Sequence, residues 1–275
     1  MGAIIIHGGA VLTPDGLRRN WGVRVEGSRI DAVAANGELP VSPEDEVLEA
    51  PEHLIMPGFV NGHNHMYGFL SHGITAETMV TEFSSFLDDF WWPYVENRLN
   101  HRLVAATTAW ACVEMIDSGV TSFADILEGP NAIPGALEVE RENASFMERT
   151  AGQNVQGLMS THMHLSENVF EPNWCAEHYG KRPVEVSEEW DGLEAGKLAD
   201  LICVRMDTPT PINEYNVYDQ LVLFRNPGDV THVMADGHWL KRDGKLTTLD
   251  RERVRRELAE VTDRFWKLQE GADVK

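Results

Sequence analysis

The sequence predicts an α/β protein in which two β-rich chain ends flank a middle that contains helices. Short strand-like runs separated by turn residues fill residues 3–53 and return at 197–249. Between them, strand-like and helical segments alternate, which is typical of βαβ units and a parallel sheet. Because the β-rich ends flank this middle, we expect them to meet in one small β-sandwich.

The composition indicates an ordinary globular chain with room for one or two domains. Its 275 residues are 43% hydrophobic and 24% charged. The formal net charge of −21 argues against nucleic acid and anionic membrane surfaces as partners, because phosphates attract basic surfaces. Three widely spaced cysteines, Cys112, Cys175 and Cys203, favour buried free thiols in a reducing compartment. With no secretory signal or membrane-spanning run, the sequence predicts a cytoplasmic protein.

The N-terminal block is expected to form a small sheet. Residues 3–12 are a β-rich run interrupted by Gly8 and Gly9, and residues 22–33 alternate around Glu26-Gly27, which predicts a hairpin. No candidate chemistry lies in this block.

The middle segment begins with a helix-rich stretch. Residues 100–118 predict a helix that Gly119 ends, with one apolar face formed by Leu103, Ala106, Trp110, Val113 and Ile116. A buried strand is expected over 120–126. Its Asp125 is either a functional group at a strand end or a helix cap. The aromatic residues within 83–92 either line a substrate pocket or belong to a core or subunit interface.

The C-terminal block predicts further strands and one long helix. Strands are expected at 199–204, 221–224 and 230–240, the last with a hairpin turn at Asp236-Gly237. An amphipathic helix is expected over 250–267, and its apolar face comprises Val254, Leu258, Val261 and Phe265.

Candidate chemistry starts in the stretch from Leu54 to Tyr67. Its His63 and His65 are two residues apart, so an extended strand directs both side chains to one face. Two imidazoles on one face suit zinc or another borderline divalent ion. The alternative is a pair of exposed loop histidines.

A second His-x-His occurs in a strand expected over 157–165. Either His162 or His164 is placed to supply a third ligand, and Glu167 follows closely. Three imidazoles plus an open position are typical of a catalytic zinc site, where the metal activates water for hydrolysis. Glu167 is then a candidate general acid and base.

Four stretches together resemble the amidohydrolase superfamily, most closely the branch with atrazine chlorohydrolase, cytosine deaminase and S-adenosylhomocysteine deaminase. They are Pro57-Gly-Phe-Val-Asn-Gly-His-Asn-His65, Gly119-Val-Thr-Ser-Phe-Ala-Asp125, Met163-His-Leu-Ser-Glu167 and Gly192-Leu-Glu-Ala-Gly-Lys-Leu-Ala-Asp-Leu201. The resemblance implies a metal-dependent hydrolase-type (β/α) barrel and a homo-oligomer. The corresponding domains are residues 1–53 and 191–275 for the sandwich and terminal helix, and 54–190 for the barrel.

The resemblance also implies roles for particular residues. His63, His65 and His164 would hold one divalent ion, zinc or alternatively iron, and Glu167 would transfer protons. The implied reaction is hydrolysis of a non-peptide C–N bond, such as deamination, on a small heterocyclic substrate. Weaker candidates for contact with that substrate are Tyr67, His72 and Trp92.

The chain departs from the family's pattern after Glu167. No fourth histidine strand or strand-end aspartate precedes Gly192, and residues 54–186 fall well short of the roughly 250 residues of a full barrel. The chain is therefore a naturally shortened relative, an artificial product, or a longer enzyme without some segments. A catalytically inactive metal- or ligand-binding relative is the alternative function, and a purely structural protein is a third.

Overall fold

The computed structural model describes residues 2–74, 81–125 and 195–270, which divide between two compact units. Of these residues, unit 1 contains 2–60, 117–122 and 195–245. Unit 2 contains the remainder. The described chain therefore passes between the units within β6 (Phe59–Asn64), near the end of α3 (His101–Ser118), within β7 (Val120–Asp125) and within β11 (Lys245–Leu246).

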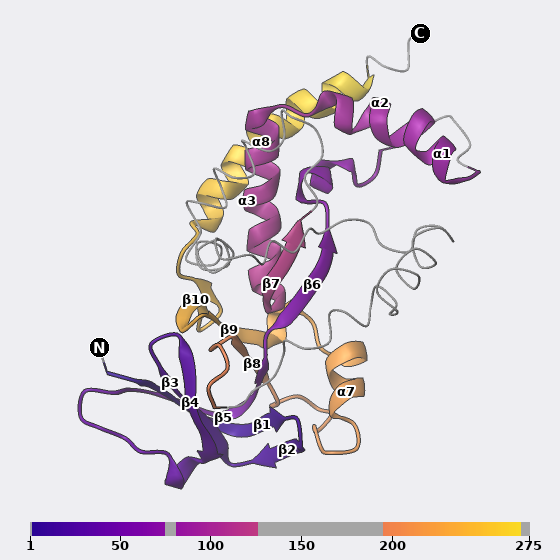
Figure 1. The fold of residues 1–275 in the computed structure, drawn as a ribbon. Coiled ribbons are helices and arrows are strands. Elements are labelled where there is room, and N and C mark those ends of the chain that lie inside the picture. The colour runs from indigo at the N-terminus through magenta and orange to yellow at the C-terminus, as the bar shows by residue number, and fades with distance from the viewer. Residues whose placement is uncertain (1, 75–80, 126–194, 271–275) are drawn as a thin grey trace, which may run out of the picture. The chain divides into compact units, whose positions relative to one another are not determined.

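Unit 1 is built on one mixed sheet to which both ends of the chain contribute (Figure 1). Its order among the described residues is β11-β10-β9-β8-β5-β1-β3-β4, and β2 pairs with β1. The strands are β1 (Ile4–Thr13), β2 (Gly16–Arg19), β3 (Trp21–Glu26), β4 (Arg29–Ala35), β5 (Glu46–Pro57), β8 (Leu201–Arg205), β9 (Val230–Ala235), β10 (His238–Arg242) and β11 (Lys245–Leu246). The expected meeting of the two ends is observed, while the sandwich form of this block stays a prediction.

The N-terminal strands follow the sequence pattern closely. β1 runs through Gly8 and Gly9 with a shift in its parallel register against β5. β3 and β4 form the expected antiparallel hairpin, and Gly27 has φ +59° in its turn. The short strand β2, which pairs antiparallel with β1, was not expected from the sequence. A 3₁₀ turn at Asn36–Glu38 follows β4.

The junction between the N-terminal and C-terminal strands is the pairing of β5 with β8. These strands are antiparallel, with Pro57 opposite Leu201 and Ile55 opposite Cys203. Apolar side chains from both ends of the chain form one core cluster, because alternating residues of neighbouring strands share a face. Its fully buried members are Ile6, Val11, Val23, Val25, Ile30, Ala50, Ile55, Ala199, Leu201, Cys203 and Met234.

The predicted strand at 221–224 is wrong. Residues Gln220–Phe224 form a π-helical turn that continues α7 (Val217–Asp219). The side chain of Asn216 accepts a hydrogen bond from the Asn213 backbone N–H, and the turn begins directly after it. Apolar residues in this turn are exposed, and Val222 is 79% accessible. A short apolar run alone cannot distinguish a strand from a helical turn.

The following hairpin is as expected. After a 3₁₀ turn at Pro227–Asp229, β9 and β10 pair antiparallel. Asp236 and Gly237 form the connection with φ +50° and +78°. Two successive positive φ values are those of a type I′ turn, which matches the right-handed twist of the strands.

Unit 2 contains most of the helical residues, whereas α7 belongs to unit 1. After β6 come a 3₁₀ helix, then α1, a π-helical turn, α2 and a second 3₁₀ turn, followed by two long helices. Their bounds are Met66–Ser71, α1 (Phe83–Phe86), Leu87–Trp91, α2 (Trp92–Tyr94), Glu96–Arg98, α3 (His101–Ser118) and α8 (Arg251–Glu270). No helix among the described residues is long and apolar enough to cross a bilayer.

Helix α3 ends where the sequence predicts, because Gly119 adopts φ +85°, a conformation that favours glycine after a helix. Four of the five residues expected on its apolar face are buried, but Trp110 is half-buried and donates to Glu114 through Nε1 at 2.9 Å. The helix also buries Val104, Thr107 and further residues outside that face. The single apolar face predicted from the sequence therefore underestimates how many residues of α3 are buried.

Helix α8 lies alongside α3 within unit 2 (Figure 1). Val261 and Phe265 of α8 pack with Leu103 and Ala106 of α3. The side chain of Asp250 accepts from the Arg253 N–H at 3.0 Å, which caps the start of α8. The amphipathic helix expected at 250–267 is thus confirmed.

The (β/α) barrel is not confirmed as such. Within the described part of 54–190, the strand pair is β6 with β7, whose arrows lie side by side and point the same way in Figure 1. The strand expected at 157–165 lies outside the described residues. The domain boundaries after residues 53 and 190 stay predictions.

Candidate functional site

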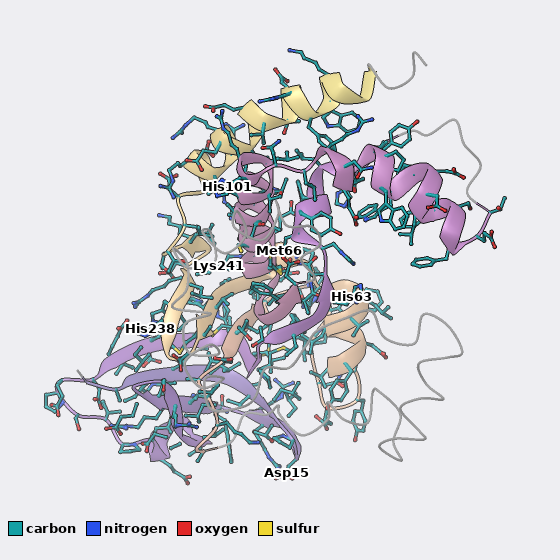
Figure 2. All side chains as sticks on the ribbon, turned by 45° about the horizontal axis from the view of Figure 1, so that its top comes forward. Asp15, His63, Met66, His101, His238 and Lys241 are labelled. Atoms are coloured by element: carbon teal, nitrogen blue, oxygen red, sulfur yellow. The ribbon has the colours of Figure 1, made fainter. Side chains whose placement is uncertain are left out.

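The His63-x-His65 pair lies at the end of β6. His63 belongs to the strand, and His65 follows its last residue with φ −132° and ψ 78° (His63 is labelled in Figure 2). The two ring centroids are 5.2 Å apart. The backbone therefore brings both imidazoles together, as expected from their i and i+2 spacing.

This spacing fits a shared metal ion. A tetrahedral zinc with Zn–N distances of about 2.0–2.1 Å places the centroids of two ligand rings about 5 Å apart. The donor chemistry agrees, because neutral imidazole suits zinc and other borderline divalent ions. The distance between the two rings is therefore compatible with His63 and His65 as ligands of one ion.

Hydrogen bonds to neighbouring side chains fix the backbone around the pair. Asn64 Oδ1 accepts from the N–H of His65 at 3.0 Å. Asp125 Oδ1, at the end of β7, accepts from the N–H of Met66 at 2.9 Å. Asp125 therefore acts on the loop that follows the histidine pair, and its carboxylate holds a peptide group in place.

A second layer of polar contacts lies behind His65. Its Nδ1 is 3.2 Å from the hydroxyl of Tyr67, and that hydroxyl donates to Glu96 Oε1 at 3.1 Å. Trp91 Nε1 donates to the same Glu96 oxygen at 2.6 Å. The Trp91 ring also meets the His65 ring edge-on, with centroids 6.3 Å apart. Side chains from three separate helical turns thus converge beside one histidine.

The three weaker candidates occupy different environments. Tyr67 is buried in the contacts just described, at 2% exposure. His72 is exposed, with its ring 5.3 Å from that of Phe69. Trp92 is 41% exposed. Contact with a substrate stays a prediction for all three.

His164 and Glu167, and the rival His162, lie outside the described residues. In the part that the structure describes, no group of three or more His, Cys, Asp or Glu side chains is arranged to hold a metal ion. The ligand set His63, His65 and His164 therefore stays a prediction, of which the described residues supply the first two.

Two residues of this arrangement were missed by sequence reasoning. Trp91 lies within the aromatic stretch 83–92 that was considered as a pocket or core, and Glu96 lies four positions after that stretch; neither had an assigned role. The signal present in the sequence is a carboxylate, Glu96, shortly after five aromatic residues within 83–92. Glu96 is partly buried, and a carboxylate in such a position is stabilised by hydrogen-bond donors, which Trp and Tyr supply.

Comparison with known proteins decides the family of this segment. The amidohydrolase family matches residues 54–171. Residues 54–171 belong to the amidohydrolase family. The match includes the histidine pair, β7, His164 and Glu167, so it confirms the resemblance that the sequence motifs indicated.

Curated relatives of this amidohydrolase segment are deaminases. The 5'-deoxyadenosine deaminase of Methanothermobacter thermautotrophicus is 36% identical over 136 residues, which are 50% of this chain and 30% of that enzyme. The 5-methylthioadenosine/S-adenosylhomocysteine deaminase of Pelotomaculum thermopropionicum is 32% identical over 142 residues, or 50% of this chain and 32% of the relative. The chain thus spans about a third of the length of these relatives.

Solved amidohydrolase-type structures share the fold. An adenosine deaminase from Xanthomonas campestris with bound zinc has a TM-score of 0.72 at 13% identity, covering 96% of this chain and 98% of that one. Atrazine chlorohydrolase from Arthrobacter aurescens TC1, complexed with zinc, has a TM-score of 0.67 at 12% identity, covering 94% and 100%. At these identities the likeness concerns the fold alone.

Proposed function

We propose that this chain is a metal-dependent hydrolase that acts on non-peptide C–N bonds of a small heterocyclic substrate. The observation that carries the proposal is the His63 and His65 pair, with ring centroids 5.2 Å apart within the amidohydrolase segment. That spacing suits one shared divalent ion. The curated relatives that match this segment are deaminases of adenosine-type nucleosides.

The assignment of roles follows the family motifs. His63, His65 and His164 hold the ion, and zinc is the proposed metal because two fold neighbours contain it. When bound, the ion supplies Lewis acidity that lowers the pKa of water toward about 7. Glu167 accepts the proton that water loses and returns it to the leaving nitrogen, so that water and a C–NH₂ group yield C=O and ammonia.

The finer architecture is part of the same proposal. Residues 54–190 form the barrel-type catalytic domain, and the two chain ends form the sandwich. The fold neighbours support this arrangement. The functional form is a homo-oligomer, because partial barrels expose strand edges that favour association.

The first experiment measures metal per chain together with intact mass. We expect about one zinc per chain in the wild type and a loss in the His63→Ala and His65→Ala variants. His238→Ala is a matched control, because His238 is exposed on β10 of unit 1. A wild-type chain that takes up no zinc or iron at the mass of this sequence would contradict the proposal.

The role of Glu167 is tested by Glu167→Gln. We expect ammonia release from 5'-deoxyadenosine or 5'-methylthioadenosine to fall by roughly 10²–10⁴-fold, because an amide cannot transfer the proton. Metal content is expected to stay at the wild-type value. Turnover equal to wild type in this variant would exclude Glu167 as the acid and base.

A second candidate function is a catalytically inactive metal- or ligand-binding relative. This candidate is favoured because the chain matches only part of the length of its relatives. It is 36% identical to the Methanococcoides burtonii 5'-deoxyadenosine deaminase and spans 57% of that enzyme. Zinc binding without ammonia release from any aminated purine, pyrimidine or triazine would support this candidate. Measured turnover that depends on Glu167 would exclude it.

A further inference from the structure

The hydroxyl of Tyr67 lies between a histidine and a carboxylate. It is 3.2 Å from His65 Nδ1 and 3.1 Å from Glu96 Oε1. Tyr67 is 2% exposed, so its ring position is determined by packing with neighbours that include Val95 and Val104. The hydroxyl group therefore lies at a fixed point between two polar partners.

The direction of these hydrogen bonds follows from the protons available. An ionised carboxylate only accepts hydrogen bonds, and a phenol has a single proton to donate. The Tyr67 proton points to Glu96, so the Tyr67 oxygen accepts from His65. That bond requires a proton on His65 Nδ1, and in a neutral imidazole the lone pair then lies on Nε2.

Trp91 strengthens this arrangement. Its Nε1–H donates to the same Oε1 atom of Glu96 at 2.6 Å. Two donors on one carboxylate oxygen hold the carboxylate of Glu96 in place. The Trp91 ring also packs edge-on against the His65 ring at 6.3 Å between centroids.

We propose that Tyr67 and Glu96 are positioning residues that set the tautomer of His65, so that Nε2 is presented for metal binding. This inference rests on the proposed function and deepens it. It assigns Tyr67 to the support of a ligand, where the sequence had suggested contact with substrate. Partners that orient metal-binding histidines in this way fix the ring and raise its basicity as a ligand.

The test uses metal-free protein labelled with ¹⁵N at histidine. Long-range ¹H–¹⁵N correlations distinguish the Nδ1–H from the Nε2–H tautomer, and the His65→Gln variant identifies the His65 signals. We expect the Nδ1–H form in the wild type at a pH where the ring is neutral. Tyr67→Phe removes the acceptor, and we expect the Nδ1–H form to lose its predominance.

Tyr94→Phe is the matched control. Tyr94 is the last residue of α2, between Trp91 and Glu96 in the sequence, and its ring contacts Phe90 and the Arg98 guanidinium. The same loss of a hydroxyl there is expected to leave the His65 tautomer unchanged. A wild-type Nε2–H form, or a Tyr67→Phe spectrum with unchanged His65 signals, would overturn the inference.

Glu96 gives an independent test with two variants. Glu96→Gln keeps an oxygen that accepts from Tyr67, so the Nδ1–H form is expected to persist. Glu96→Leu leaves the Tyr67 hydroxyl free to donate to Nδ1, and the tautomer is expected to reverse to Nε2–H. An unchanged tautomer in a folded Glu96→Leu variant would show that Glu96 does not direct the hydrogen bond.

Zinc affinity connects the tautomer to the site. By competition with a chelator, we expect Tyr67→Phe to bind zinc roughly 10–100-fold more weakly than the wild type, with Tyr94→Phe unchanged. Equal zinc affinity in Tyr67→Phe would refute the role in ligand positioning. The tautomer is read without metal, so a wild-type chain with the Nδ1–H form that binds no metal would refute the proposed function alone.

Discussion

Gly58 lies at a point where two strands approach so closely that a side chain has no room. A Cβ atom on Gly58 would be 2.1 Å from Thr121 Oγ1 and 2.3 Å from its Cγ2. Thr121 is 3% exposed, so its side chain has no open space into which it can turn. Gly58 also donates through its N–H to the Asp200 carbonyl at 3.1 Å. The glycine that precedes β6 is therefore a requirement of packing.

We expect Gly58→Ala to lower the free energy of unfolding by about 1–3 kcal/mol, the usual effect of overpacking a core. Urea denaturation measures this change. Gly37→Ala is the control, because a Cβ at Gly37 meets nothing within 4 Å. Thr121→Ala in the Gly58→Ala background should restore part of the stability, and equal stability of wild type and Gly58→Ala would contradict the steric argument.

The histidine pair could be predicted from sequence, whereas the contacts behind it could not. His63 and His65 are two residues apart, and strand geometry alone brings their side chains to one face. Glu96 is 29 positions from Tyr67, and their hydrogen bond depends on how the intervening turns fold. Sequence spacing carries no information about such a contact.

Helices with clear terminal residues were predicted well. Asp250 marks the start of α8, and Gly119 marks the end of α3. Both act through local backbone geometry that a short sequence determines. The run at 221–224 had no such marker. Its apolar residues suggested a buried strand, but Leu223 and Phe224 are 66% and 62% exposed in a π-helical turn.

The cap of α8 gives a prediction at this scale. We expect Asp250→Ala to lower the free energy of unfolding, because the N–H of Arg253 loses its acceptor. This bond also lowers the pKa of the Asp250 carboxyl, so the effect of the variant should disappear when acid protonates that group.

Asp263→Ala is the control for the cap. Asp263 is exposed inside the same helix, where alanine has the higher helix propensity, so this variant should be neutral or slightly more stable. Thermal unfolding of both variants followed by circular dichroism separates the two cases. Equal losses of stability in Asp250→Ala and Asp263→Ala would argue against a specific helix cap at Asp250.

For the whole molecule, the sheet of unit 1 contains two histidines that are held neutral. His53 on β5 and His232 on β9 flank β8, with ring centroids 6.0 Å apart. Burial lowers the pKa of both, and it outweighs the opposing effects of Asp207 on His53 and of Asp243 on His232. The strands that carry these histidines, β5 and β9, come from the N-terminal and C-terminal parts of the chain.

This arrangement makes the stability of the sheet depend on pH. Unfolded histidine has a pKa of about 6.5, so just below that pH the unfolded chain binds more protons than the folded chain. The free energy of unfolding should therefore fall as the pH drops from about 7.5 to about 5.5. Urea denaturation at the two pH values measures the difference.

His53→Phe should reduce this pH dependence. The substitution keeps a ring in place, and neither ring nitrogen of His53 has a hydrogen-bond partner among the described residues. His238→Gln, at an exposed position on β10, is the control and should retain the wild-type dependence. A His53→Phe variant with the full dependence would assign the effect to other groups.

The meeting of the chain ends was predictable at this scale, but its register was not. The β-rich composition of both ends indicated that they meet in one β-sandwich, and β5 and β8 do pair with each other. The pairing of Pro57 with Leu201 depends on side-chain packing across the core, which local patterns do not determine. The extent of the barrel could not be predicted either, because the sequence departs from the family pattern after Glu167.

The pairing of Pro57 with Leu201 has a consequence for how such a chain can change in length. The polypeptide leaves the sheet at Pro57 and re-enters it at Leu201, which is the paired position on the neighbouring strand. The residues between these two positions therefore form a loop whose ends are held together by the sheet. For a flexible loop, doubling the contour length adds only about 0.6 kcal/mol of closure entropy. Insertions and deletions between these two anchor points therefore cost the anchoring sheet little, and a sheet of this kind can tolerate inserts of very different sizes during evolution.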